Sequence, residues 1–568
     1  MPTTGLKNIF NRVRVWSETN YLLYCFSLVI LGVLARFFFA QFIPISALGS
    51  DDFGNLRKSI YYPQGDFFMG GLKLDDQGQY GGLLYPFSIV PWQWFSSVYA
   101  KMQALFLLNS LFAGATAFLS CLILARITTA RSFLAPLIIV SCGPVFLVTY
   151  AALAENLLYT FIAFAGYTLI EFSNNPRSRK WLFLVLLSAL LAPMVRQPGY
   201  AVSLGLAVAL LACEFAPLRK RICLSGLVLI VGTVPSMLVA KQIGAIIGKQ
   251  RESVYMNQVS LYFDSLSDIP TLFSLGYNQL LYLIFAGALF PMLAVLFVFR
   301  GEIKQIFSGK SIYHWYALIV GGLFIAFCLL HLIIKFDLDP NVRSFIYGRY
   351  DDPALIVLLP LGLAYLLNVK ALPWLSRFCF AILLMLIAYF VVARAFLDAD
   401  GGTTLNISGY FFPLSYPQLF WVPIVSMGVV FIVFMLPQKI AVASCLALAL
   451  VINLLTIGSG VPALAKKARS YYRLAAGADW IIDNIDSRQC IAYNSRWADY
   501  IPRNKRKQAG KIIRMMEVFT YPRPALRSAD KSQWEICSLL FAPLSAEQMP
   551  SPWQKVWQNG DYLLWQKP

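Results

Sequence analysis

The feature that most constrains this chain is a series of apolar runs, each about 17 to 23 residues long. A run of this length can cross a hydrocarbon core of about 30 Å as a single helix. Hydrophobic residues make up 58% of the 568 residues and charged residues only 13%, whereas about 25% is usual for charged residues in soluble domains. The sequence therefore predicts a polytopic membrane protein.

We expect about thirteen membrane helices from these runs. The first, near residues 21–43, is longer than the core of a signal peptide and lacks a convincing cleavage site, so it is expected to stay in the membrane. The later helices are expected near residues 103–125, 132–150, 155–172, 181–195, 199–215, 222–241, 277–299, 315–334, 353–369, 378–397, 418–436 and 440–460.

The distribution of lysine and arginine orients this bundle. If the N-terminus is cytoplasmic, the short basic connections, such as 177–180 and 219–221, fall on the cytoplasmic side, as the positive-inside rule requires. An odd number of helices then sends the C-terminus across the membrane. The same loop positions account for the net charge of +19, so we expect no nucleic-acid partner.

The predicted membrane topology divides the chain into two domains. Residues 1–464 are expected to form an all-α transmembrane domain that includes an extracytoplasmic loop at 44–102. Residues 465–568 are expected to form a small extracytoplasmic α/β domain, with a helical stretch at 470–484 and strands at 489–493 and 562–566. Within this tail, Cys490 and Cys537 are the only cysteines, and on an oxidising side they could form a disulfide.

Several chemistries are excluded by what the sequence lacks. His314 and His331 are the only histidines, so no site with several histidine ligands can form. The patterns GxxxxGK[ST], GxGxxG and HExxH are absent. ATP-driven and zinc-peptidase chemistries are therefore not expected.

An acidic pair, Asp51 and Asp52, directly follows the first apolar run. Two adjacent carboxylates repel each other, which raises the pKa of one and suits a general base, unless a cation or the neighbouring Arg57 and Lys58 compensate. The alternative is a structural role, with Asp51 as a helix N-cap in a solvated loop.

Two further charges stand at the same external level. Glu155 lies at the mouth of an otherwise apolar hairpin, where an uncompensated carboxylate is costly, so it either faces a water-filled cavity or reaches water as a turn residue. Arg196 interrupts a pair of short helices and could present its guanidinium to a phosphate or pair with Glu155.

A polar segment, 335–353, precedes a late apolar helix. Arg349, beside Gly348, would meet an anionic ligand at headgroup depth, and Tyr347 and Tyr350 would supply hydroxyls; alternatively, these residues form an interfacial anchor. His331, near the outer end of the preceding helix, is a minor candidate.

Together, the acidic pair after the first helix, the second acid in the next external turn, the arginine between short helices and Gly-Arg-Tyr-x-x-Pro before a late helix resemble the GT-C superfamily of polytopic glycosyltransferases. The resemblance covers the order of elements over about residues 1–370. It implies inverting transfer of a hexose or pentose from a polyprenyl-phosphate donor to a glycan, lipid or protein acceptor of the cell envelope. It also implies the extracytoplasmic face of a bacterial inner membrane as the place of reaction.

The resemblance also implies residue roles. Asp51 or Asp52 matches the first-loop acid that deprotonates the acceptor or binds a divalent cation, and Glu155 matches the second-loop acid. The residues expected near the donor phosphate are Arg349, Arg196, Lys58, Tyr350 and Arg343. A divalent cation, Mg²⁺ or Mn²⁺, could be held by Asp51, Asp52 and Glu155, but metal-independent members exist, so the cofactor stays open.

Two other functions remain. A polysaccharide polymerase or ligase also uses polyprenyl-linked substrates, but it typically places its main external loop late in the chain, whereas here the acidic loop comes first. A transporter of lipid-linked sugars would carry charges at mid-membrane in interrupted helices, whereas here the acids stand at one external level.

Overall fold

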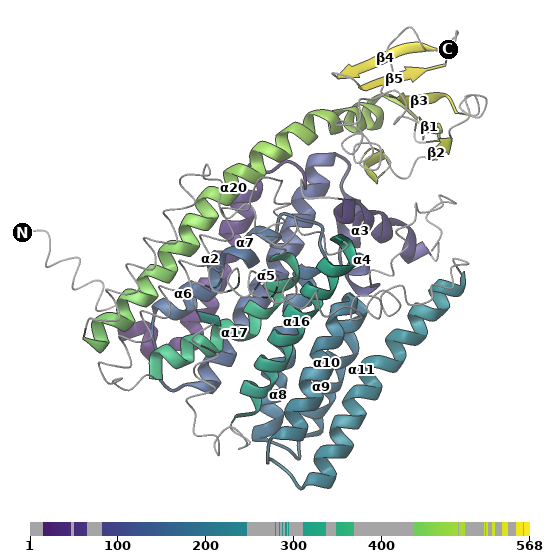
Figure 1. Cartoon of the computed structure of the whole chain (residues 1–568). Coiled ribbons are helices and arrows are strands. Elements are labelled where there is room, and N and C mark those ends of the chain that lie inside the picture. Colours follow the sequence, from purple (N-terminus) through teal and green to yellow (C-terminus); the bar gives the residue numbers. More distant parts are fainter. Residues whose placement is uncertain are drawn as a thin grey trace, which may run out of the picture. The chain divides into compact units, whose positions relative to one another are not determined.

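The structure is a computed structural model, and it describes most of the N-terminal half of the chain and parts of the remainder. The described residues are 15–46, 50–64, 82–246, seven single positions between 276 and 294, 311–336, 348–368, 437–486, 488–494, 516, 518–520, 525–528, 537–542, 553–559 and 562–567. Figure 1 labels the helices and strands along these segments.

The chain divides into two compact units. Unit 1 comprises residues 1–36, 110–149 and 155–460, and unit 2 comprises residues 37–109, 150–154 and 461–568. Unit 2 thus combines the first loop, the short turn before Glu155 and the C-terminal tail. The predicted domain boundary at 464/465 falls inside a single long helix, α20 (Gln438–Asn484), and stays a prediction.

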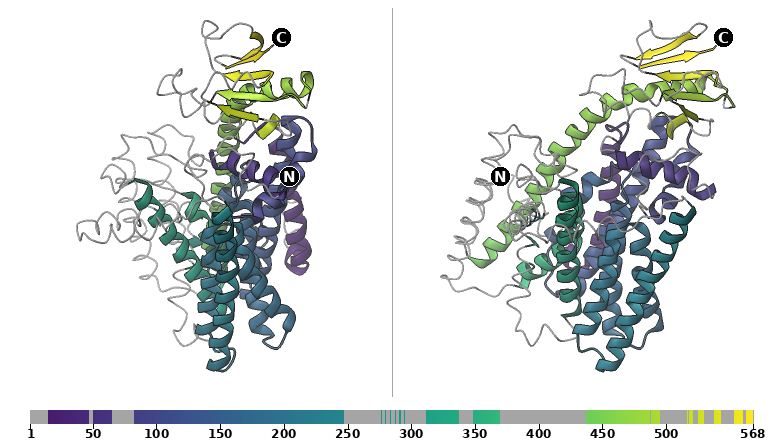
Figure 2. Two further views of the ribbon diagram at one scale, coloured as in Figure 1. Left: turned by 90° about the vertical axis from the view of Figure 1, so that its right-hand side faces the viewer. Right: turned by 45° about the vertical axis from the view of Figure 1, so that its right-hand side comes forward.

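Unit 1 is helical in all the parts that the structure describes. Its elements are most of α2 (Tyr21–Ala40), the later part of α5 (Val98–Ile127), α6 (Leu134–Val140), α7 (Gly143–Val148), α8 (Glu155–Asn174), α9 (Arg179–Val195), η3 (Gln197–Gly199), α10 (Tyr200–Ala212), α11 (Leu218–Ile246), α16 (Ile312–Phe336), α17 (Gly348–Asn368) and the first part of α20. The helices α8, α9, α10 and α11 run side by side, and α10 also packs on α16 (Figures 1 and 2).

Small residues and buried hydroxyls hold this helical packing together. A Cβ atom on Gly205 of α10 would overlap the side chain of Val320 of α16, so these two helices approach too closely for a larger residue. On α16, the hydroxyl of Tyr316 donates to the Ile162 carbonyl of α8 at 2.8 Å, and the hydroxyl of Tyr313 donates to the Val357 carbonyl of α17 at 2.9 Å. Each buried hydroxyl is thereby satisfied.

The membrane-protein prediction is confirmed. Among the described residues, five helices are long and apolar enough to cross a bilayer, namely Tyr21–Ala40, Val98–Ile127, Leu218–Gln242, Ile312–Leu330 and Ile440–Lys466. The total of about thirteen stays a prediction, because the spans expected near 378–397 and 418–436, and most of 277–299, lie outside the described residues.

Two elements differ from the predicted ones. The single span expected at 132–150 is two short helices, α6 and α7, because the helix stops at Ser141 and Pro144 starts a new one where its missing N–H costs nothing. The helices expected at 440–460 and 470–484 are one continuous helix, α20, since the Ala-, Leu- and Lys-rich residues between them favour helix.

Unit 2 contains short helices from the first loop and a sheet from the tail. The helices are α3 (Ser50–Tyr61), η1 (Tyr62–Gln64), α4 (Leu84–Ser88), η2 (Val90–Trp94), the first turns of α5, the end of α2 and the second part of α20. The strands are β1 (Ile491–Asn494), β2 (Ala525–Ser528), β3 (Leu539–Ala542), β4 (Gln554–Asn559) and β5 (Tyr562–Gln566). The sheet order is β2-β1-β3-β5-β4, parallel from β2 to β3 and antiparallel from β3 to β4, which confirms the predicted α/β tail.

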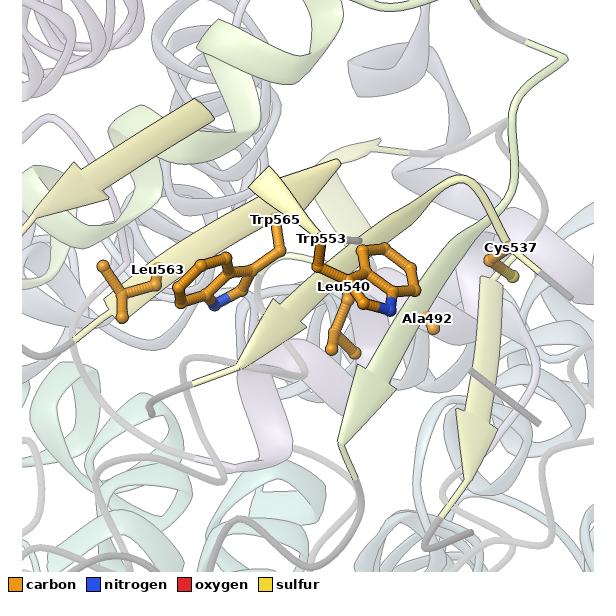
Figure 3. Close-up of a cluster of buried hydrophobic side chains, with 6 residues drawn as sticks. All are labelled: Ala492, Cys537, Leu540, Trp553, Leu563 and Trp565. Atoms are coloured by element: carbon orange, nitrogen blue, oxygen red, sulfur yellow. The ribbon is translucent and has the colours of Figure 1, made fainter. Parts of the chain in front are cut away.

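One face of this sheet carries a small hydrophobic core (Figure 3). Its buried members are Ala492, Cys537, Leu540, Trp553, Leu563 and Trp565. The structure joins Cys537 to Cys490 in a disulfide whose Cα atoms are 4.8 Å apart, within the usual range for such a bond. The first strand is thereby linked covalently to the segment that leads into β3.

Candidate active site

The acidic pair lies in the first turn of a helix. α3 begins at Ser50, so Asp51 is the second residue of the helix and Asp52 the third. An N-cap residue directly precedes the first residue of a helix, so the predicted alternative placed Asp51 two positions earlier than the structure does. Carboxylates in the first turn are favoured by the unpaired N–H groups and the dipole at a helix N-terminus.

Uncharged side chains anchor α3 within unit 2. The amide of Asn55 donates to the Ala152 carbonyl at 2.8 Å, and Ala152 belongs to the turn that precedes Glu155 in the chain. One turn further along α3, the hydroxyl of Ser59 accepts from Trp92 Nε1 at 2.7 Å. Leu56 and Ile60 are buried next to these two anchors. Hydrogen bonds and buried apolar side chains therefore both contribute to the position of α3.

Glu155 and Arg196 form a buried ion pair in unit 1. Glu155 is the first residue of α8 and is only 1% exposed, and Arg196 follows the last residue of α9, with its side chain 14% exposed. Arg196 Nη1 donates to Glu155 Oε1. Of the roles that the sequence left open for Arg196, pairing with Glu155 is the one that the structure contains.

The sequence around Arg196 explains how it reaches Glu155. Arg196 has an extended backbone, and the chain then turns through η3 back against the end of α9. A Cβ atom on Gly199 would overlap the Ala192 carbonyl, so only glycine allows this close approach. The last turn of α9 therefore presents Arg196 toward the start of α8.

The other predicted donor-site residues are placed only in part. Arg349 and Tyr350 are the second and third residues of α17, and Lys58 lies in the last turn of α3. His331 lies on α16. The side chains of Asp51, Asp52, Arg349, Tyr350 and His331, and all of Arg343 and Tyr347, lie outside what the structure describes. Their roles stay predictions.

Sequence reasoning missed two buried charges in unit 1. Arg36 of α2 is fully buried and donates to the carbonyls of Gly32 at 3.1 Å and Val140 at 2.8 Å, with its guanidinium 4.5 Å from the centre of the Phe146 ring. Asp352 of α17 is also fully buried, three residues after Arg349. Both residues interrupt or border apolar runs, and that signal alone could have identified them.

No metal centre is evident in the described part of the chain, where no three His, Cys, Asp or Glu residues lie together. The carboxylate of Glu155, one of the three predicted ligands, is occupied by Arg196. The predicted divalent cation therefore has no support from this part of the site and stays a prediction.

Comparison with known proteins gives matches at the level of fold. No family model matches the sequence, and no curated protein does. Among solved structures, ArnT from Cupriavidus metallidurans in the apo state is 11% identical, with a TM-score of 0.51 over 97% of this chain and 98% of that one. ArnT from the same organism bound to undecaprenyl phosphate is 12% identical, with a TM-score of 0.53 over 95% and 97% of the two chains.

Proposed function

Because this chain has the fold of the GT-C superfamily, to which ArnT belongs, we propose that it is a glycosyltransferase that uses a polyprenyl-phosphate-linked sugar as donor. The observation that carries the proposal is the likeness, over almost the whole of both chains, to a structure that holds undecaprenyl phosphate. Buried and helix-terminal charges at the positions that the resemblance implies support it.

The proposed reaction is a direct displacement with inversion at the anomeric carbon. A carboxylate takes the proton of an acceptor hydroxyl, the acceptor oxygen bonds to the anomeric carbon, and the bond from that carbon to the phosphate oxygen breaks. The polyprenyl phosphate leaves with the electron pair. Phosphate is a good leaving group when its charge is held, so positioning and electrostatic stabilisation are the main tasks of the protein.

We assign the proton transfer to Asp51 or Asp52. Both lie in the first turn of a helix that is anchored at Asn55 and Ser59, so the backbone of the acid pair is held while its carboxylates serve the acceptor. General base catalysis by a positioned side chain contributes about 10²- to 10⁴-fold.

We assign the leaving phosphate to arginine and lysine side chains. Arg196 donates to Glu155 through Nη1, and the planar guanidinium, with five N–H donors, suits the geometry of a phosphate. Glu155 then keeps Arg196 in place. The further phosphate-binding candidates are Arg349, Tyr350, Lys58 and Arg343.

The location follows from the same proposal. We place the reaction at the extracytoplasmic face of a bacterial inner membrane, with the N-terminus in the cytoplasm and an envelope glycan, lipid or protein as acceptor. The transferred sugar is a hexose or a pentose. A divalent cation held by Asp51, Asp52 and Glu155 would assist the same deprotonation, but no step above depends on it.

A transfer assay tests the proposal. The purified protein is incubated in detergent with a panel of radiolabelled polyprenyl-phosphate sugars and a crude envelope acceptor. Label should enter the acceptor with one donor, and Asp51→Asn or Asp52→Asn should lower the rate at least about 100-fold without changing expression or melting temperature. Asp483→Asn, which changes an exposed carboxylate of α20, is the matched control.

Two results would overturn the assignment. Full activity in both Asp51→Asn and Asp52→Asn would remove the acid pair from the chemistry. Failure of every donor, combined with movement of labelled lipid across vesicle membranes, would identify a transporter instead.

A further inference from the structure

A buried tryptophan connects the acid-bearing helix α3 to the rest of unit 2. Trp92 of η2 is 1% exposed, and its Nε1 donates to the hydroxyl of Ser59 on α3 at 2.7 Å. The next residue, Gln93, donates through Nε2 to the Ser59 carbonyl, also at 2.7 Å. Two consecutive residues of η2 therefore bind the same residue of α3.

The other side of Trp92 faces the C-terminal tail. The ring of Phe519 packs edge-on against the Trp92 ring, with 6.3 Å between the ring centres. Lys101 of α5 lies with its Nζ 5.7 Å from the centre of the same tryptophan ring and donates to the Phe519 carbonyl at 3.2 Å. Phe519 is fully buried. Trp92 thus contacts Ser59 of α3, Phe519 of the tail and Lys101 of α5.

Placing Lys101 beside Trp92 and Phe519 has a desolvation cost. Its side chain is 6% exposed, and burying an ammonium group costs free energy unless the charge is compensated. A methionine would pack in similar space without that cost. The ammonium is kept close to Trp92 and Phe519, where it combines a cation–π contact with a hydrogen bond to the tail backbone.

A second contact ties the tail to the same place. Asp479, near the end of α20, accepts from the backbone N–H of Val98 at 2.8 Å. Val98 is the first residue of α5, so the carboxylate satisfies one of the unpaired N–H groups at this helix end. Lys101 stands one turn further along α5, and Asp479 attracts its charge.

The helix α3 needs such support. It has 12 residues, and a helix shorter than about 12 to 15 residues is marginal in water by itself. Two of its described residues, Leu56 and Ile60, are both apolar and fully buried. The hydrogen bonds at Asn55 and Ser59 add to this packing in holding α3 in place.

We propose that Trp92 is a positioning residue through which the C-terminal tail holds α3, and with it Asp51 and Asp52, in the geometry that proton transfer requires. The tail is then part of the catalytic apparatus, in addition to any role in binding an acceptor. This inference rests on the proposed function. It adds that the contact of Phe519 and Lys101 with Trp92 sets the turnover rate.

Trp92→Phe tests the link to α3. This change keeps a ring against Phe519 and Lys101 but removes the Nε1 donor to Ser59. We expect kcat to fall about 10- to 100-fold while KM for the donor stays within about twofold, because misplacing a catalytic group by about 1 Å costs roughly 100-fold. The matched control is Trp94→Phe, two residues away on the same short helix and 79% exposed, which should leave kcat unchanged.

Lys101→Met tests the link to the tail. Lys101 has its hydrogen bond to the tail and not to α3, so a purely local role would leave α3 unaffected. We expect faster hydrogen exchange at the amides of residues 53–61 in the full-length variant, together with a fall in kcat like that of Trp92→Phe. The double variant should be no slower than the slower single variant, because both changes break one connection.

The outcomes separate this inference from the proposed function. If Asp51→Asn and Asp52→Asn abolish transfer but Trp92→Phe and Lys101→Met keep kcat and hydrogen exchange unchanged, the inference is wrong and the proposed function stands. If the aspartate variants are fully active, the proposed function fails, and exchange at residues 53–61 still reports whether the tail holds α3. Additive losses in the double variant would show two independent effects and overturn the coupling.

Discussion

Units 1 and 2 each contain acidic residues to which we assign a role, and the two units hold these residues in different ways. In unit 1, Glu155 is buried and its charge is matched by Arg196. In unit 2, hydrogen bonds between uncharged groups tie the acid-bearing helix α3 to other segments, among them those of Asn55 with Ala152 and of Trp92 with Ser59. Glu155 is thus held by its own charge, whereas hydrogen bonds of neutral groups help to hold the helix that carries Asp51 and Asp52.

The acids are held differently because their environments differ in polarity. Glu155 stands where apolar helices meet, and an unpaired carboxylate there carries a large desolvation cost. Asp51 and Asp52 occupy a helix N-terminus in a polar loop, where the helix itself favours negative charge. The comparison predicts that unit 1 loses stability when one charge of the Glu155–Arg196 pair is removed. It also predicts that the transfer rate falls when a hydrogen bond that positions α3 in unit 2 is removed.

The largest effect is expected from Arg196→Met. This change leaves Glu155 buried without its partner, which should lower the free energy of unfolding by about 3 to 5 kcal/mol. Transfer activity should fall with it, because Arg196 is also assigned to the phosphate. Thermal unfolding in detergent measures the first effect and the transfer assay the second.

The control separates charge from side-chain volume. Glu155→Gln combined with Arg196→Met removes both charges and should restore most of the lost stability, while activity stays low. Arg179→Met, at an exposed arginine at the start of α9, should change neither quantity. Equal melting temperatures for Arg196→Met and the unaltered protein would contradict the buried pair.

The disulfide of unit 2 gives the next largest effect. Cys490 and Cys537 are 47 residues apart, and closing a loop of this size stabilises a domain by about 4 kcal/mol from chain entropy. Cys490→Ala with Cys537→Ala should therefore destabilise the tail without unfolding the helices of unit 1. Mass spectrometry of the unreduced protein should show one linked peptide, and two free thiols would contradict the bond.

Asn55→Ala should have a smaller effect on stability and a clear one on rate. It removes the hydrogen bond to the Ala152 carbonyl and leaves that buried carbonyl without this donor, at a cost of about 1 to 3 kcal/mol. Since α3 also loses an anchor, kcat should fall while KM for the donor does not. Asn175→Ala, at an exposed position after α8, serves as the control, and an unchanged kcat in Asn55→Ala would show that α3 is held without it.

The sequence predicts the structure most reliably where a single physical requirement determines it. The apolar runs identify α2, α5, α11 and α16, because a helix is the only way for one segment to satisfy its backbone in lipid. The positions of Glu155 and Arg196 were predictable for the same reason, since charges stand out among apolar helices. The sequence allowed two partners for Arg196, a phosphate or Glu155, and did not decide between them.

Contacts between distant parts of the chain could not be predicted in this way. Lys101 donates to Phe519, which is 418 residues away, and nothing in either local sequence indicates the other. Trp92 lies in an aromatic stretch, and nothing in the local sequence indicates its buried position beside Ser59. These contacts depend on how the loop and the tail pack together, and hydrophobic periodicity gives no information on such packing.

The smallest expected effect concerns Asp479, the carboxylate that joins α20 to the start of α5 in unit 2. Burial raises the pKa of Asp479 above its ordinary value of 3.8, and the nearby Asp483 acts in the same direction. The N–H of Val98 and the charge of Lys101 oppose this rise without cancelling it. The folded protein therefore binds a proton at Asp479 more tightly than the unfolded chain does.

The sign of the pH dependence follows from this shift. The contribution of Asp479 to stability is fully present below pH 3.8 and is lost as the pH rises through the raised pKa of the folded state. Asp479→Asn keeps an oxygen that can accept from Val98 but cannot titrate. Melting temperatures of the two proteins, measured from acidic to neutral pH, should diverge in favour of the variant as the pH rises and then stay parallel. A difference that is constant at all pH values would show that the carboxyl keeps its ordinary pKa and that its value to unit 2 is the hydrogen bond to α5 alone.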